Sequence, residues 1–267
     1  MSNNILAKIV AHKFGEVAAR KQQISIEELE AMPLFSIPAK SLKDNLLSTS
    51  KTGIIAEFKR QSPSKGIINA AADIIEVTKA YTDFGAAGVS VLTDEHFFGG
   101  SLEDLSMAVK NDIPVLRKEF IIDEFQIIEA KAYGASVILL IAACLTPAEI
   151  ELLAGTAKAL GMEVLLEIHD DSELEHICEE IDFVGINNRS LKSFEVNIEH
   201  SLQLKSKLPK SKLCIAESGI YDLETFKVLK QEGFDGFLMG EFFMKQEDPA
   251  KAFKTFSEAI KTINNAN

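Results

Sequence analysis

Residues 136–168 read SVILLIAACLTPAEIELLAGTAKALGMEVLLEI and contain one complete strand–helix–strand unit. The apolar run Ser136–Ile141 predicts a strand, and the TPAE sequence at 146–149 then supplies a hydroxyl N-cap, a proline at the first helical position and a glutamate at the third. Gly161 marks the end of this helix before a second run, Glu163–Ile168. Both runs are continuous rather than alternating, which is typical of parallel strands covered by helices. The unit therefore predicts a right-handed crossover between neighbouring strands.

The same unit recurs along the chain. Glycines precede several of the later apolar runs, where they commonly end a helix, and Ser172 with Glu175 resembles a second capping box. The eight strand candidates are Gly53–Lys59, Gly88–Thr93, Ile113–Lys118, Ser136–Ile141, Glu163–Ile168, Asp182–Asn187, Lys212–Glu217 and Asp235–Gly240.

This repetition predicts an α/β fold, a (β/α)8 TIM barrel with an N-terminal helical extension. The 267 residues match the roughly 250 that such a barrel needs. An open, doubly wound sheet is the alternative, but no GxGxxG sequence follows the first strand. We expect a single domain over residues 1–267, with the barrel at 51–267 and the extension at 1–50. Apolar residues such as Ile5, Ile9 and Phe14 let the extension pack on the barrel or only plug its bottom, and both interpretations stay open.

Composition excludes several classes of protein. The formal net charge of −12 disfavours a nucleic acid partner, because a phosphate-backbone binder normally carries a basic face. The longest apolar run, at 137–145, is too short to span a membrane, and the N-terminus lacks the features of a signal peptide. The three cysteines are odd in number and follow no CxxC spacing, so we expect buried, reduced thiols in a cytoplasmic protein. We expect a monomer or a weak homodimer.

Charged residues stand at the C-terminal ends of alternate predicted strands. In a (β/α)8 barrel, alternate strands contribute the four side chains of one interior layer. Strands one, three, five and seven would therefore form a top layer of three carboxylates and one ammonium, with Lys59 just above it: Glu57, Lys118, Glu167 and Glu217. Salt bridges at the rim are the alternative, but active sites of such barrels lie at this end. On strand six, Asn187 and Arg189 share one face.

Two glycine-containing turns predict a phosphate site. Ser218-Gly219 follows strand seven and Gly240-Glu241 follows strand eight, where barrels of this kind commonly bind phosphate. The loop at 60–66, RQSPSKG, is basic and rich in hydroxyls, so it either closes over an anion or is only solvated. Phe98 and Phe120 are candidates for the apolar walls of a ring site, whereas we expect Phe97 to serve packing.

The strand-end motifs resemble those of the indole-3-glycerol-phosphate synthase family. The sequence EFKRQSPSKG at 57–66 is similar to the E-x-K-x-x-S-P-S-x-G signature of that family. Further similar blocks follow in order: LTD at 92–94 with Phe98, Gly100 and Ser101, RKEFIID at 117–123, EIH at 167–169, GINNR at 185–189 with Leu191, AESGI at 216–220, and LMGE at 238–241. Phe58 and Phe242-Phe243 depart from the family pattern without removing a catalytic group.

The resemblance implies a reaction and a set of roles. The substrate would be 1-(2-carboxyphenylamino)-1-deoxyribulose 5-phosphate, which loses CO2 and water to become indole-3-glycerol phosphate in tryptophan biosynthesis, with no metal or organic cofactor. The resemblance makes Lys118 the general acid for the carbonyl oxygen and Glu167 the general acid and base of the later steps. Lys59 would hold the substrate carboxylate. The residues that would orient these groups are Glu57, Asn187 and Glu217.

The resemblance also implies the residues that hold the substrate. Those that would hold its phosphate are Arg189, Ser218, Gly219, Gly240 and Glu241, the last through its backbone, while Ser62 would help to hold the anion. Those that would flank the aromatic ring are Phe98, Phe120, Leu139 and Leu191. The five histidines form no HxxxH pair and no cysteine joins them, which agrees with the absence of a metal.

Two rival functions remain on the same fold. A phosphosugar isomerase or Schiff-base aldolase would use the same barrel, and fold alone does not exclude it. An aldolase would form an imine on Lys118 that borohydride traps. A binding protein without activity is the second rival, and the presence of both Lys118 and Glu167 argues against it.

Overall fold

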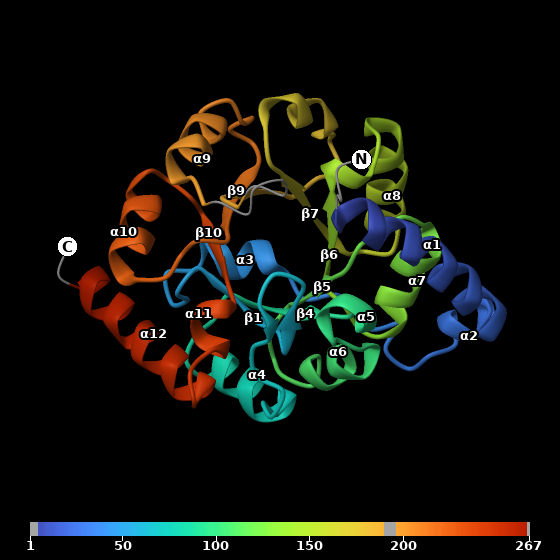
Figure 1. Ribbon diagram of the computed structural model, residues 1–267, viewed down its shortest axis with the longest axis horizontal. Coiled ribbons are helices and arrows are strands. Elements are labelled where there is room, and N and C mark those ends of the chain that lie inside the picture. Colours follow the sequence, from blue (N-terminus) through green and yellow to red (C-terminus); the bar gives the residue numbers. More distant parts are fainter. Residues whose placement is uncertain (1–4, 190–195, 266–267) are drawn as a thin grey trace.

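A computed structural model describes residues 5–189 and 196–265, with side chains to residue 262. Eight parallel strands close into a barrel in the order β1-β10-β9-β8-β7-β6-β5-β4. The helices form a ring around these strands (Figure 1). The strands are β1 Ile54–Phe58, β4 Gly88–Leu92, β5 Val115–Lys118, β6 Val137–Ile141, β7 Glu163–Ile168, β8 Phe183–Asn187, β9 Leu213–Glu217 and β10 Gly236–Met239. The predicted (β/α)8 TIM barrel is therefore confirmed, and each predicted strand overlaps one of these.

The helices alternate with the strands. The barrel helices are α4 Ile74–Asp83, α6 Leu102–Ala108, α7 Glu124–Ala132, α8 Pro147–Ala159, α9 Ile198–Lys205, α10 Leu223–Gln231 and α12 Pro249–Asn265. Shorter elements are α2 Ile26–Glu30, α5 Glu95–Phe98, α11 Glu241–Met244, η1 Ala142–Cys144 and η2 Asp171–His176. The Thr146 capping box is confirmed at α8. The one expected at Ser172 is wrong, because Asp170 caps a 3-10 helix there.

Side chains alternate between two apolar layers. One layer packs the outer faces of the strands on the helices and includes Ile54, Val89 and Ile138. The other fills the barrel interior, where Ile55, Leu116, Leu139, Leu165, Phe183 and Ile215 are all buried. This alternation fixes which strand residues face the barrel axis, so it also decides which polar residues can meet at the top.

Residues 5–50 contact both ends of the barrel. Helix α1, Ile5–Gln23, lies against α7 at the right of Figure 1 and carries Ile5, Leu6 and Ile9 to the cavity at the top. Helix α3, Leu42–Leu47, closes the bottom. Phe14, in contrast to Ile9, is largely exposed. The apolar face of α1 that packs on the barrel is therefore narrower than the sequence pattern predicts.

Helix α3 fits the bottom of the barrel because two strands begin with glycine. Leu42 and Leu46 belong to the interior apolar cluster. A Cβ at Gly88 would lie 2.8 Å from Leu42, and one at Gly236 would lie 3.0 Å from Leu46. The Glu163 carboxylate at the start of β7 accepts hydrogen bonds from the Leu42 backbone and the Ser41 hydroxyl, which anchors the first turn of α3.

The loop after β1 contains a hairpin that sequence reasoning did not predict. Strands β2, Gln61–Ser62, and β3, Gly66–Ile67, pair antiparallel at the top of the barrel. Such two-residue strands give no periodic signal. The three cysteines are free, and Cys214 is buried as expected, but Cys144 and Cys178 are only partly buried, so that expectation was wrong for both.

The packing of α3 into the bottom of the barrel makes a testable contribution to stability. Leu42→Ala should lower the free energy of unfolding by about 2–5 kcal/mol, because it removes a buried side chain and leaves a cavity between α3 and the strands. Urea unfolding measures the loss. Leu47→Ala on the same helix is the control, since Leu47 is 59% exposed. Equal losses of unfolding free energy in the two variants would contradict a stabilising role for the burial of Leu42.

Candidate active site

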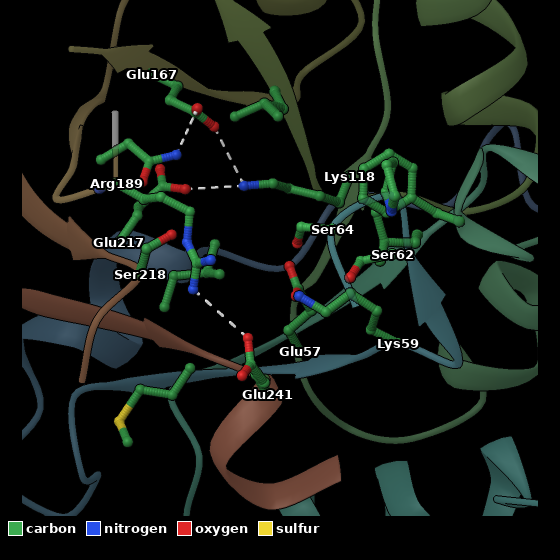
Figure 2. A pocket seen from close by; sticks show the side chains of 18 of the residues that line it. Glu57, Lys59, Ser62, Ser64, Lys118, Glu167, Arg189, Glu217, Ser218 and Glu241 are labelled. Carbon is green, nitrogen blue, oxygen red and sulfur yellow. Dashed lines mark hydrogen bonds and ion pairs between the residues drawn. The ribbon is translucent and has the colours of Figure 1, made fainter. Parts of the chain in front are cut away.

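A cavity opens at the C-terminal ends of the strands. It is lined by residues from strands all around the barrel and from the loops that follow them (Figure 2). The predicted site residues that line it are Glu57, Lys59, Ser62, Phe98, Lys118, Phe120, Leu139, Glu167, Asn187, Arg189, Glu217, Ser218, Gly219, Gly240 and Glu241. Leu191, the remaining predicted residue, lies outside the described residues. The structure thus brings together the described residues that the sequence analysis selected from the whole chain.

The charged layer at the top of the barrel centres on Lys118. Its Nζ lies 2.8 Å from Glu217 Oε2 and 3.3 Å from Glu167 Oε2, and Figure 2 shows it reaching between them. Burial alone lowers the pKa of Lys118, but the charges of Glu217, Glu167 and Glu57 outweigh burial and hold the pKa above its ordinary value. Lys118 is therefore a charged proton donor at neutral pH.

The Glu167 carboxylate is ionised and held on two sides. Asn187 Nδ2 donates a hydrogen bond to Glu167 Oε1 at 2.9 Å, and His169 Nε2 lies 3.2 Å from the same oxygen. Burial raises the pKa of Glu167, but the ammonium of Lys118 and the contact with His169 hold the pKa below its usual range. Burial lowers the pKa of His169, but the carboxylates of Glu167 and Glu173 outweigh burial and raise this pKa to about 10.

Glu217 has the opposite protonation tendency. It is 1% exposed, and burial raises the pKa of Glu217 to about 7, although Lys118 opposes the shift. Its Oε2 pairs with Lys118, while its Oε1 has no hydrogen-bond partner among the described residues. Glu217 and Glu167 thus differ in pKa because of their surroundings, which is the usual arrangement of groups that exchange protons in different steps.

Lys59 lies nearer the mouth than Lys118. Its Nζ lies 2.7 Å from Glu57 Oε1, and its side chain is 17% exposed. Glu57 is therefore the partner that holds Lys59. Lys118 is exposed to nearly the same degree, 15%, but it is the last residue of β5, whereas Lys59 lies beyond the end of β1.

An apolar wall and a polar rim face each other across the cavity. The rings of Phe98 and Phe120 have their centroids 5.9 Å apart. Phe97 instead packs against His12 and His96, as expected. On the polar side, Arg189 contacts the Tyr221 hydroxyl at 2.7 Å and the Glu241 carboxylate at 3.5 Å.

Backbone conformation shapes the polar rim. Ser218 has a φ of 63°, the sole non-glycine residue with positive φ in the described part of the chain, and Gly219 follows with a φ of 74°. Such strain at the end of a strand is typical of functional turns. At the next strand end, a Cβ on Gly240 would lie 2.8 Å from Glu57 Cβ, so only glycine leaves room for both.

Sequence reasoning missed several residues of this site. His169 was quoted as part of a motif without a role, yet it contacts Glu167. Tyr221 and Ser64 line the cavity, as do Ile5, Leu6 and Ile9 of α1. The helix residues gave no signal because their apolar spacing is that of any packed helix.

Comparison with known sequences places this chain in one family. A sequence model of the family described as indole-3-glycerol phosphate synthase matches residues 6–256. The chain belongs to the indole-3-glycerol phosphate synthase family. An indole-3-glycerol phosphate synthase of Bacteroides thetaiotaomicron is 47% identical over 97% of this chain and 99% of its own length. Those of Acinetobacter baumannii and Bordetella pertussis are 40% and 43% identical and cover 98% and 92% of this chain and 99% and 96% of their own lengths.

Solved structures confirm the fold of this synthase family member. The alpha subunit of tryptophan synthase from Legionella pneumophila superposes with a TM-score of 0.62 at 14% identity, over 84% of this chain and 98% of its own. A thiamine phosphate pyrophosphorylase from Pyrococcus furiosus gives 0.57 at 14% identity, over 79% and 95%. At such identities these likenesses show the barrel alone.

The family assignment makes this chain a decarboxylating lyase of tryptophan biosynthesis that acts on a phosphorylated small molecule. In residues 5–189 and 196–265, no group of three or more metal-ligating side chains gathers. No helix in that same part is long and apolar enough to cross a membrane.

The raised pKa of Glu217 predicts a pH-dependent effect of Glu217→Gln. A carboxyl whose folded-state pKa is raised contributes stability that is full below pH 4.5 and is lost as the pH rises through about 7. Relative to the wild type, the free energy of unfolding of the variant should therefore increase across this window, by about 1.4 kcal/mol per unit of pKa difference.

Urea titrations at several pH values from below 4.5 to above 7 measure this difference. Glu232→Gln, at an exposed position, controls for the change in net charge. A difference between Glu217→Gln and wild type that stays constant across the window would contradict the buried, protonated carboxyl.

Proposed function

We propose that the cavity at the top of the barrel is where this enzyme converts 1-(2-carboxyphenylamino)-1-deoxyribulose 5-phosphate into indole-3-glycerol phosphate, CO2 and water. The observation that carries the proposal is the ammonium of the largely buried Lys118 side chain between Glu217 and Glu167, at the strand ends of a chain that belongs to this family. Ring closure on a ketone needs an acid at the developing alkoxide, and a charged, positioned lysine supplies both a proton and a compensating charge.

The first step joins two carbons. The ring carbon that bears the carboxylate attacks the ribulose carbonyl, and the carbonyl oxygen takes a proton from Lys118. Departure of CO2 then returns its bonding electron pair to the ring. This role for Lys118 is supported by its raised pKa and by its position at the floor of the cavity.

The later steps remove water. Glu167 moves the protons of this dehydration, a role supported by its ionised state and by the orienting hydrogen bond from Asn187. Glu217 orients Lys118, and Glu57 orients Lys59. Lys59 holds the substrate carboxylate, which agrees with its position nearer the mouth.

Two further groups of residues hold the substrate ends. The phosphate lies at the polar rim, against Arg189, Ser218, Gly219, Gly240 and the backbone of Glu241, while Ser62 helps to hold the anion. The aromatic ring lies against Phe98, Phe120 and Leu139, and the family resemblance alone adds Leu191, which is outside the described residues.

We also propose that residues 1–267 form one domain, with 1–50 as its extension, and that the enzyme works in the cytoplasm without a metal or organic cofactor. The packing of α1 and α3 on opposite ends of one barrel supports the single domain. The free cysteines and the biosynthetic family support the location. We keep the expectation of a monomer or a weak homodimer, which sedimentation of the purified protein measures.

A direct assay tests the function. The purified protein, with chelator and without added metal, receives the carboxyphenylamino-ribulose phosphate, and indole fluorescence is followed. Fluorescence that rises with enzyme concentration is expected. Absence of indole fluorescence with folded protein would contradict the proposal. An imine on Lys118 that borohydride traps would favour the aldolase.

The two lysines should differ in their kinetic effect. Lys118→Met removes an interaction made in the transition state and should lower kcat by about 100-fold or more, the scale of general acid catalysis. Lys59→Met should raise KM and also lower kcat, because an unanchored carboxylate misplaces the reacting carbon. Steady-state and single-turnover kinetics distinguish them. Near wild-type chemistry in Lys118→Met, with slow chemistry in Lys59→Met, would reverse the two assigned roles.

Arg189→Ala should raise KM more than it lowers kcat. Phosphate contacts change little between the ground state and the transition state, so their loss weakens binding. Lys40→Ala removes the same charge near Asn111, away from the cavity lining, and controls for net charge. Steady-state kinetics measure both variants, and a defect of Arg189→Ala in kcat alone would contradict the phosphate site.

A further inference from the structure

A buried ammonium group lies behind the aromatic wall of the cavity. Lys13 of α1 is 0% exposed, and its Nζ lies 2.9 Å from Asp94, 3.0 Å from Glu119 and 2.9 Å from Glu16. Burial lowers the pKa of Lys13, but Glu119 and Asp94 outweigh it and hold the pKa above its ordinary value. Lys13 is therefore charged, and it does not line the cavity.

The two buried partners of Lys13 each hold the backbone of a cavity phenylalanine. Asp94 Oδ1 accepts hydrogen bonds from the backbone N–H groups of Phe97 and Phe98, at 2.7 and 3.2 Å. Glu119 Oε1 accepts one from the backbone N–H of Phe120 at 2.8 Å. Each carboxylate thus joins the ammonium on one side to a ring-bearing residue on the other.

These contacts bridge two separate loops. Asp94 follows β4 and Glu119 follows β5, so Lys13 fixes the loop of Phe98 relative to the loop of Phe120. Among the described residues Lys13 is the sole ion-pair partner of Asp94, whereas Glu119 also lies 3.9 Å from Arg117, so movement of Asp94 away from Lys13 would leave a buried carboxylate without a cation, which is strongly unfavourable. The rings of Phe98 and Phe120, which these two loops carry, have their centroids 5.9 Å apart.

Attachment of α1 to the barrel does not by itself require Lys13. Arg20 on the same helix also binds a buried carboxylate, that of Glu129, at 2.8 Å. Glu129 keeps Arg117 as a second partner, and Arg20 contacts neither Asp94 nor Glu119 in the contacts of the described residues. The position of Lys13, between the two loops, serves something more specific than docking.

We propose that Lys13 is a positioning residue for the aromatic half of the substrate: through Asp94 and Glu119 its ammonium holds Phe98 and Phe120 at the spacing that accepts the ring. The inference rests on the proposed placement of that ring between these phenylalanines. Loss of the bridge should weaken binding of the ring and leave binding of the phosphate unchanged.

The test compares two ligands. One is the substrate with its ketone reduced to an alcohol, which keeps ring and phosphate but cannot cyclise. The other is ribulose 5-phosphate, which lacks the ring. Lys13→Met should raise the Kd of the first by about tenfold, the cost of misplacing a binding group, and should change that of the second less than about twofold. KM for the substrate should rise more than kcat falls.

Arg20→Met is the matched control. It removes another cation of α1 from a buried carboxylate, so it reports loosened docking of the helix without loss of the bridge. We expect Arg20→Met to bind both ligands as the wild type does. Equal weakening of the reduced substrate by Arg20→Met and Lys13→Met would overturn the proposal in favour of general docking.

A charge-balanced variant guards against misfolding. Lys13→Met leaves Asp94 without its ammonium, whereas Lys13→Met combined with Asp94→Asn removes both charges and retains an amide oxygen to accept from the backbone at α5. This double variant should fold and should still show the ring-specific loss. Wild-type affinity of the folded double variant for the reduced substrate would overturn the proposal.

Phe120→Ala distinguishes the placement of the ring from the role of Lys13. A ring-specific loss in Phe120→Ala without one in Lys13→Met leaves the ring site standing and overturns the role of Lys13. If Phe120→Ala weakens neither ligand or both equally, the ring placement is wrong and the inference fails with it. Ring-specific losses in Phe120→Ala, in Lys13→Met and in the double variant support both.

Discussion

The side chain of Lys118 is largely buried at the top of the barrel, and carboxylates from alternate strands hold it in the charged form against the cost of burial. This requirement explains the residues at the same height on the strands in between. A Cβ at Gly185 would lie 2.1 Å from Glu217 Oε1, and one at Gly240 would lie 2.8 Å from Glu57. The charged residues on β1, β5, β7 and β9 and the two glycines, Gly185 on β8 and Gly240 just after β10, are thus parts of one arrangement. The closed barrel meets it because a fixed register brings alternate strand ends to a common level.

The two ends of the barrel solve opposite problems. At the bottom, Leu42 and Leu46 fill the interior with apolar side chains, and their burial contributes stability. At the top, Glu167, Lys118 and Glu217 are buried charges, and assembling such a group costs desolvation that mutual attraction only offsets. Because the same strands run from the bottom to the top, the free energy gained by apolar burial at the bottom offsets the desolvation cost of the charges at the top. A site of this kind can hold its groups in a costly arrangement because the rest of the barrel supplies the excess stability.

Sequence could predict most of this because the decisive signals are local. Continuous apolar runs mark the strands, and a period of two places Glu57, Lys118, Glu167 and Glu217 on inward faces without any knowledge of contacts. The hairpin β2–β3 was missed because two-residue strands have no period, and η2 was misjudged because Asp170, not Ser172, caps it. The contact of Lys13 with Asp94 and Glu119 could not be predicted from the sequence for another reason. A lysine on an amphipathic helix is ordinarily expected to face solvent, and its partners lie far along the chain.

Helix α1 has a consequence for the order in which the molecule is built. It precedes β4 and β5 in the chain and is synthesised before them, yet its partners Asp94 and Glu119 follow those strands, so the helix cannot bind them until the strands have been made. Contacts of such sequence separation form late, because loop closure must come before they add stability. The wall behind the ring site is therefore finished after the strands that carry it. A growing chain can therefore form the first strands of the barrel before it forms the binding site, because a helix made before those strands completes the wall only after them.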